Sequence, residues 1–158
     1  MAFKQRIKDS YSQNWHVDIM NSRKAVTYKT FVFDVKPQLY LSCINVVQYR
    51  VALTQFRVRS NHLQVETGSW HRDTVIPYHE RYCTLCNLHV IEDEYHFLLV
   101  CPNYMDLREQ YIARYYRVRP NMLKFVTLMS SSNVRVLKRL SIFLHKAFLK
   151  RKTDVFVN

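Results

Sequence analysis

Apolar residues recur every three or four positions along much of the chain, a pattern that predicts a mainly helical protein. The first such stretch predicts a helix over roughly residues 2–21. Residues 37–59 have apolar side chains on most faces and predict one long, largely buried helix. The β-branched and aromatic residues 25–35 predict a short strand or an extended connector between the two. The apolar stripe of the first helix recurs at strides of four: Phe3, Ile7, Tyr11, Trp15 and Ile19.

The second half of the chain predicts three more helices. Residues 102–116 carry an apolar stripe at helical spacing, and Pro120 opens a short helix that runs to about Met129. A last helix, over about residues 133–152, has leucines on one side and cations on the other. With a polar loop over residues 60–80, these patterns predict a single, mainly α domain with at most one short strand pair.

Composition narrows the possible functions. The chain of 158 residues has one glycine, Gly68, which excludes phosphate-binding loops, dinucleotide fingerprints and nucleophile elbows. Its 24 Lys and Arg against 12 Asp and Glu give a formal net charge of +12. That excess favours a polyanionic partner, with nucleic acid ahead of an anionic membrane.

The lengths of the apolar stretches also indicate in which cellular compartment we expect the protein. The longest, residues 39–47, is too short to cross a bilayer, and the N-terminal residues lack the apolar centre of a signal peptide. We therefore expect an intracellular protein, nuclear or cytoplasmic, with reduced cysteines and no membrane partner.

Three cysteines and a histidine in the middle of the chain have the spacing of a metal site. Cys83, Cys86, His96 and Cys101 form the pattern C-x2-C-x9-H-x4-C. Zinc prefers four such ligands in a tetrahedron, and a site closed by four protein ligands is structural because no position remains for substrate. One structural Zn²⁺ bound here would contribute on the order of 10 kcal/mol to folding.

Other interpretations of these residues remain open. Cys83 and Cys86 would form a disulfide in a redox protein, although no thioredoxin-like pattern surrounds them. His89 is a rival to His96 as the third ligand, and all four residues would be ordinary core side chains if no metal binds. Cys43 lies in the predicted long helix, and we expect it to be a core residue.

Residues on both sides of the metal motif complete a longer pattern. It consists of these blocks: Phe56-Arg57, His62-Leu63, Val65-Glu66 with Gly68, Glu92-Asp93-Glu94, His96-Phe97, Cys101-Pro102, and Tyr104 with Leu107-Arg108. The pattern resembles the zinc-binding region downstream of the polymerase in non-LTR retrotransposon reverse transcriptases. The similarity covers roughly residues 45–116 and implies that Cys83, Cys86, His96 and Cys101 bind zinc in a region that helps to hold RNA or target DNA.

Catalytic motifs are incomplete throughout the chain. The run from Tyr104 to Leu107 lacks the second carboxylate that two-metal polymerase chemistry needs. The triplet His71-Arg72-Asp73 resembles part of a kinase catalytic loop, but position 78 holds Tyr78 in place of the metal-binding Asn. We therefore expect a non-enzymatic fragment, similar to part of an RNA-directed DNA polymerase but without its active site.

Basic residues in two groups are the candidates for contact with phosphate, because guanidinium and ammonium groups pair with phosphate oxygens. One group leads into the metal motif and the other lies in the last predicted helix. The candidates are Arg50, Arg57, Arg59, Arg72, Arg81, Arg135, Lys138 and Arg139.

The sequence thus predicts a zinc-stabilised module that binds RNA or DNA, largely through phosphate. We expect a helical N-terminal part (residues 1–80), a zinc knuckle with its following helix (81–116) and basic C-terminal helices (117–158). The alternative is a structural or protein-interaction module that docks on a partner or on a missing reverse transcriptase domain. Ile142 and Leu149 motivate that alternative, because both are apolar residues among the cations of the last helix.

Overall fold

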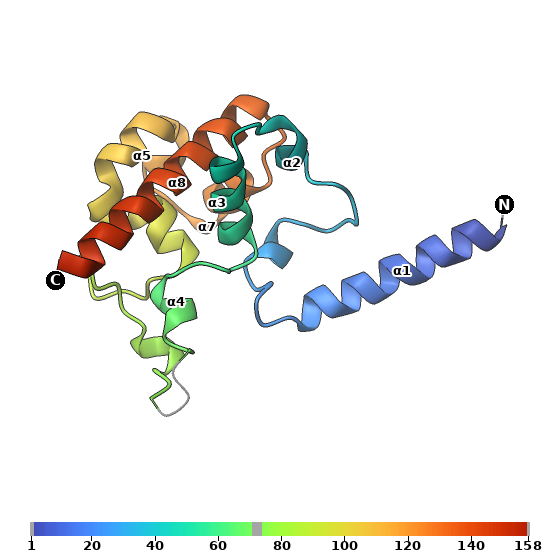
Figure 1. Ribbon diagram of the computed structural model, residues 1–158, viewed down its shortest axis with the longest axis horizontal. Coiled ribbons are helices and arrows are strands. Elements are labelled where there is room, and N and C mark those ends of the chain that lie inside the picture. Colours follow the sequence, from blue (N-terminus) through green and yellow to red (C-terminus); the bar gives the residue numbers. More distant parts are fainter. Residues whose placement is uncertain (1, 71–73, 158) are drawn as a thin grey trace.

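The computed structural model describes residues 2–70 and 74–157, and it is mainly helical, as predicted (Figure 1). These residues contain no β-strand, and one antiparallel bridge pairs Tyr82 with Ile91. Within the same part of the chain, no helix combines the length and the apolar character that a bilayer crossing needs.

The N-terminal helix α1 (Ala2–Asn21) has the predicted bounds and extends away from the rest of the molecule (Figure 1). Each stride of four residues advances about 40° past a full helical turn, so its apolar stripe winds around the helix. As a result only Trp15, near the C-terminal end, packs against the core, while Phe3 and Tyr11 are 75% and 62% exposed.

Of the two alternatives predicted for residues 25–35, a short strand or an extended connector, the strand is not present. This segment forms turns and the short 3₁₀ helix η1 (Tyr28–Thr30), and it buries Phe31 and Val32 against the core. The aromatic and β-branched composition therefore reflects burial of a connector and not strand pairing.

The prediction of one long helix over residues 37–59 is wrong. The segment forms two helices, α2 (Leu39–Cys43) and α3 (Val47–Arg57), because Ile44 and Val46 adopt extended backbone conformations. The break carries Ile44 into the core, where it is 2% exposed, and Arg50 Nη1 donates to its carbonyl oxygen at 3.1 Å.

The predicted polar loop over residues 60–80 contains two short helices, α4 (Gln64–Thr67) and η2 (Tyr78–Glu80). The predicted helix over residues 102–116 is also divided. It comprises η4 (Pro102–Tyr104), α5 (Met105–Tyr111) and α6 (Arg114–Arg117), separated where Ile112 becomes extended and enters the core.

The last two helices lie close to their predicted positions. Helix α7 (Met122–Met129) begins two residues later than expected, with the Asn121 side chain accepting a hydrogen bond from Lys124 N. Helix α8 (Val134–Val157) begins one residue after the predicted start and runs five residues past the predicted end at Lys152.

Helix α8 forms the centre of the fold and packs against α2, α3 and α5 (Figure 1). Its buried face continues the predicted leucine stripe through Leu140, Leu144 and Ala147. The ring of Phe97 lies at the middle of the core, with the rings of Tyr104 and Phe148 at centroid distances of 4.6 and 5.2 Å. This core holds the segment that carries the cysteines and histidine.

Candidate metal centre

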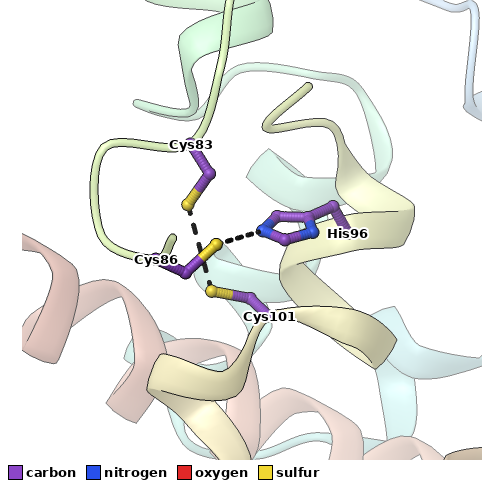
Figure 2. Close-up of side chains that lie close together, drawn as sticks. All are labelled: Cys83, Cys86, His96 and Cys101. Carbon is purple, nitrogen blue, oxygen red and sulfur yellow. Dashed lines mark hydrogen bonds between the residues drawn. The ribbon is translucent and has the colours of Figure 1, made fainter. Parts of the chain in front are cut away.

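The four predicted ligands converge on one point (Figure 2). The Sγ atoms of Cys83, Cys86 and Cys101 and a ring nitrogen of His96 all lie within 4.8 Å of one another. Cys83 Sγ is 3.9 Å from Cys101 Sγ, and Cys86 Sγ is 3.5 Å from His96 Nε2. Zinc–sulfur bonds of about 2.3 Å give a tetrahedron whose edges are about 3.8 Å, so these separations match a bound metal ion.

A tight loop positions the two N-terminal ligands. Its ends are held by two backbone hydrogen bonds, from Cys83 N to the Val90 carbonyl and from Glu92 N to the Arg81 carbonyl, both 2.9 Å long. The chain reverses between them through His89, which has a positive φ of 49°. The loop therefore presents Cys83 and Cys86 toward the same side (Figure 2).

A π-helical turn, η3 (His96–Val100), positions the other two ligands. Cys101 N donates to the His96 carbonyl at 2.7 Å, a bond that spans five residues and brings both side chains to one side. Asp93 Oδ1 accepts from His96 N at 2.7 Å at the start of the turn. At its end, Arg108 Nε and Nη2 donate to the carbonyls of Leu98 and Cys101, at 2.8 and 2.7 Å.

Two buried carboxylates lie beside the ligands. Glu92 is fully buried, and its Oε2 accepts from Arg151 Nη2 at 2.6 Å and from Gln64 N at 2.8 Å. Its Oε1 lies 3.9 Å from Cys83 Sγ. Glu92 therefore connects the metal loop to the start of α4 and to the C-terminal part of α8.

The second carboxylate, Glu94, is 3% exposed and lies 3.5 Å from Arg59 Nε. Thr27 Oγ1 donates to Glu94 Oε2 at 3.1 Å. Burial raises the pKa of Glu94, although the charge of Arg59 opposes that effect. In the acidic run Glu92-Asp93-Glu94, the side chains of both glutamates thus have partners inside the protein.

The thiols differ in their tendency to ionise when no metal is bound. Cys83 shares a hydrogen bond with Cys101, which together with burial raises the pKa of Cys83 to about 12. The same hydrogen bond lowers the pKa of Cys101, because it stabilises the thiolate. Burial also raises the pKa of Cys86. A metal ion that binds here must therefore displace protons from Cys83 and Cys86.

The structure can be compared with the other interpretations of the cysteines and histidines given above. All four cysteines are free thiols, so Cys83 and Cys86 form no disulfide here. His89 is exposed on the loop and is not in the group of ligand atoms that includes His96. Cys43 is half-buried on α2, also outside that group, and packs at the edge of the core. His96 Nδ1 has no hydrogen-bond partner among the described residues, although it is buried.

Two of the arginines predicted to contact nucleic acid are buried. Arg57 is 3% exposed and donates to Gln38 Oε1 and to the carbonyl of Met129. Arg59 is 8% exposed, has a positive φ of 55° and pairs with Glu94. Both side chains have internal structural roles, and their contact with nucleic acid stays a prediction.

Three further candidates also have internal partners. Arg50 donates to Ile44 as described above, and Arg81 Nη1 donates to the Val65 carbonyl at 2.7 Å. Arg139 is exposed but its guanidinium donates to the carbonyls of Tyr111 and Gln110 at the end of α5. Opposite charge at a helix C-terminus stabilises the helix, so Arg139 holds α5 against α8.

Arg135 and Lys138 differ from the other candidates. Both are exposed on the first turns of α8, and neither side chain forms a hydrogen bond or ion pair within the described part of the chain. They are three residues apart and therefore neighbours on one helix face. Arg72 lies outside the described residues.

Sequence reasoning missed Arg108, Arg151 and the buried role of Glu92. A signal for Arg151 was available, because Leu144, Ala147 and Arg151 continue one helical stripe at spacings of three and four. No comparable pattern distinguishes Glu92 from its acidic neighbours.

The comparisons with known proteins found no family model, no curated protein and no solved structure that matches this chain.

Proposed function

We propose that the protein is a zinc-stabilised module that binds RNA or DNA through phosphate, as its resemblance to the zinc-binding region of non-LTR retrotransposon reverse transcriptases implies. The observation that carries the proposal is the convergence of Cys83, Cys86, His96 and Cys101 in a chain of net charge +12. Three soft thiolates and one imidazole favour zinc over magnesium or calcium, which prefer oxygen ligands.

The charge distribution supports an electrostatic role for the surface. Glu92 and Glu94 are buried and paired with Arg151 and Arg59, so the acidic run beside the metal ligands adds little negative potential outside. Arg135, Lys138 and Lys152 on α8 are exposed and have no side-chain partner among the described residues. Cations without internal partners are free to pair with phosphate and to release its counterions.

Anisotropy of labelled RNA and duplex DNA with the zinc-loaded protein tests this function over about 50 to 300 mM salt. Neutralisation of roughly five phosphates gives a log–log slope near −4.5 on duplex DNA. The double variant Arg135→Gln with Lys138→Gln should weaken binding to all sequences and make the slope shallower by about one for each phosphate that is no longer neutralised. Lys36→Gln is the matched control, because Lys36 already pairs with Asp34. Binding that is unchanged by salt and by the Arg135→Gln, Lys138→Gln double variant would contradict the proposal.

One observation favours a second candidate, a protein-interaction module. A groove of about 660 Å³ lies between α3, α4 and α8, and its apolar lining includes Val51, Leu149 and Val155. Of the described residues, no acidic one lines the groove, whereas Lys152 and two histidines do. An acidic amphipathic helix fits this combination, because its apolar face would fill the groove and its carboxylates would meet Lys152.

A designed acidic amphipathic peptide, titrated against the protein, tests the second candidate. Leu149→Gln should abolish binding of the peptide and leave nucleic-acid binding unchanged. Leu123→Gln is the control, because Leu123 is an exposed leucine outside the groove, on α7. Equal peptide binding by both variants would exclude the groove as the docking surface.

A further inference from the structure

The charge of Arg57 is buried without a carboxylate to balance it. Arg57 is 3% exposed, at the end of α3, and it forms no ion pair within the described residues. Two other buried arginines, Arg59 and Arg151, pair with Glu94 and Glu92. Since a buried charge is costly unless it is compensated, the environment of Arg57 calls for explanation.

The partners of Arg57 leave part of its guanidinium uncompensated. One amino group donates to Gln38 Oε1 at 2.8 Å and the other to the Met129 carbonyl. The rings of Phe31 and Tyr40 lie 5.0 and 4.7 Å from its centre. Among the described residues, Nε has no hydrogen-bond partner, and the side chains and the carbonyl that contact the guanidinium are uncharged. These contacts orient the guanidinium, but they supply only the partial negative charge of the Met129 carbonyl at the C-terminal end of α7.

Arg57 also lines a small cavity, of about 140 Å³. The cavity is bordered by the connection from α7 to α8, and its other polar lining residues are Gln38, Tyr40 and the three serines at 130–132. Within the part of the chain that the structure describes, no carboxylate lines it. The hydroxyl groups of Tyr40, Ser131 and Ser132 can donate hydrogen bonds to a ligand in this space.

We propose that this cavity binds a phosphate monoester, for which the Arg57 guanidinium is the counter-charge. A guanidinium and several hydroxyl groups around one small space suit the oxygens of a tetrahedral phosphate. Because Arg57 is almost completely covered, the phosphate must enter end-on. A monoester carries one substituent and can enter in this way, whereas an internal phosphodiester carries a sugar on both sides.

In a nucleic acid, the group with this shape is the phosphate at the end of a strand. Arg135 and Lys138 lie on the first turns of α8, the helix that starts beside the cavity. They are placed to contact the next phosphates of a strand whose terminal phosphate lies at Arg57. This last step rests on the proposed nucleic-acid-binding function, whereas binding of phosphate itself does not.

Titration of the zinc-loaded protein with inorganic phosphate, at constant ionic strength in chloride, tests the site. We expect saturable binding by calorimetry and a rise in Tm, because a ligand that binds only the folded state stabilises it. Arg57→Gln should lose this response. Arg117→Gln should keep it, because Arg117 pairs with Glu109 and is not among the residues that line the cavity. No saturable binding by the wild-type protein would overturn the proposal.

A second variant keeps the test valid if Arg57→Gln fails to fold. Ser132 is exposed at the edge of the cavity, and Ser132→Asp would place a carboxylate there. We expect this variant to fold and to lose the phosphate response, because its own carboxylate competes for Arg57. Ser60→Asp, at an exposed serine outside the cavity, should retain the response. An unchanged response in Ser132→Asp would contradict the site.

Oligonucleotides separate this inference from the proposed function. Single strands with a 5′-phosphate, a 3′-phosphate or only terminal hydroxyls are compared by anisotropy. A phosphorylated end should bind at least about tenfold more tightly, which corresponds to about 1.4 kcal/mol, and Arg57→Gln should remove the difference. Equal, salt-dependent binding of all three strands would leave nucleic-acid binding in place and refute terminal-phosphate recognition. Phosphate binding without binding of any strand would refute the proposed function alone.

Discussion

Arg151 Nη2 lies 2.6 Å from Glu92 Oε2, and this pair joins the C-terminal part of α8 to the loop that carries Cys83 and Cys86. Both side chains are buried, and the same carboxylate oxygen accepts from Gln64 N at the start of α4. Three segments distant in sequence therefore share one carboxylate. If the loop that carries Cys83 and Cys86 separated from α8, the charges of Glu92 and Arg151 would become exposed to solvent or would stay buried without a partner.

Loss of either partner of this pair should strongly destabilise the protein. Arg151→Met leaves Glu92 buried without its cation, and Glu92→Gln leaves Arg151 without its anion. Removal of one partner of a buried pair costs about 3–5 kcal/mol, because the remaining charge keeps its desolvation penalty. Urea denaturation of the zinc-loaded protein measures this loss.

The exposed pair of Arg117 and Glu109, at 2.8 Å, is the matched control. Arg117→Met should cost about 1 kcal/mol or less, because solvent screens exposed ion pairs. Equal losses in Arg151→Met and Arg117→Met would show that the Glu92–Arg151 pair does not connect α8 to the metal loop.

Substitution of the metal ligands should release zinc. Cys83→Ser and His96→Ala each remove one of the four converging ligands, so metal content should fall and the Tm should drop by more than about 10 °C. Metal analysis by mass spectrometry after dialysis measures the first effect, and calorimetry measures the second.

His89→Ala and Cys43→Ser should both retain one zinc ion per chain. His89 is exposed on the loop and Cys43 lies on α2, so neither belongs to the ligand group. Zinc retention by His96→Ala together with loss from His89→Ala would reverse the assignment of the third ligand.

Much of the local structure could be predicted from periodicity, because a helix that packs on one side repeats its apolar residues every three or four positions. Helix α8 was predicted in this way, and Pro120 predicted the start of α7 to within two residues. The breaks at Ile44 and Ile112 were not predicted. Both are apolar residues that satisfy a helical pattern, yet each becomes extended so that the chain can turn while the side chain stays in the core.

The convergence of Cys83, Cys86, His96 and Cys101 could be predicted because four residues of suitable chemistry have a recognisable spacing. The surroundings of the arginines could not, since net charge gives no indication of burial. For Arg57 a partial signal existed: it follows Leu53 by four residues and so lies on the same, buried face of α3. Burial of a charge depends on partners such as Gln38 and Met129, which are far away in sequence.

Zinc affinity should rise steeply with pH. The pKa of Cys83 is raised to about 12 and that of Cys86 is also raised, so both thiols are protonated near neutrality without metal. Zinc must displace both protons, and each displaced proton makes Kd about tenfold lower per unit rise in pH. We expect Kd to fall at least about a hundredfold per unit between about pH 7 and 8, because Cys83 and Cys86 are both protonated before zinc binds. Competition with a chromophoric chelator measures this slope, and a Kd independent of pH would show that the thiols are already ionised.

Gly68 should not tolerate alanine, although its φ of −62° is open to any residue. A Cβ at this position would lie 2.8 Å from Arg81 Nε and 2.8 Å from the Gln64 carbonyl oxygen. Arg81 is held in that place because its Nε donates to the Ile76 carbonyl and its Nη1 to the Val65 carbonyl. The chain's one glycine is therefore required by the close passage of Arg81 just before the metal loop.

Gly68→Ala should cost about 1–3 kcal/mol in the free energy of unfolding, as overpacking does elsewhere. Ser69→Ala, at the exposed neighbouring position, should cost less than about 1 kcal/mol. The double variant Gly68→Ala with Arg81→Ala should recover part of the loss, because the side chain that collides with the new Cβ is gone. If the double variant is no more stable than the sum of the two single losses predicts, the collision with Arg81 is not the cause.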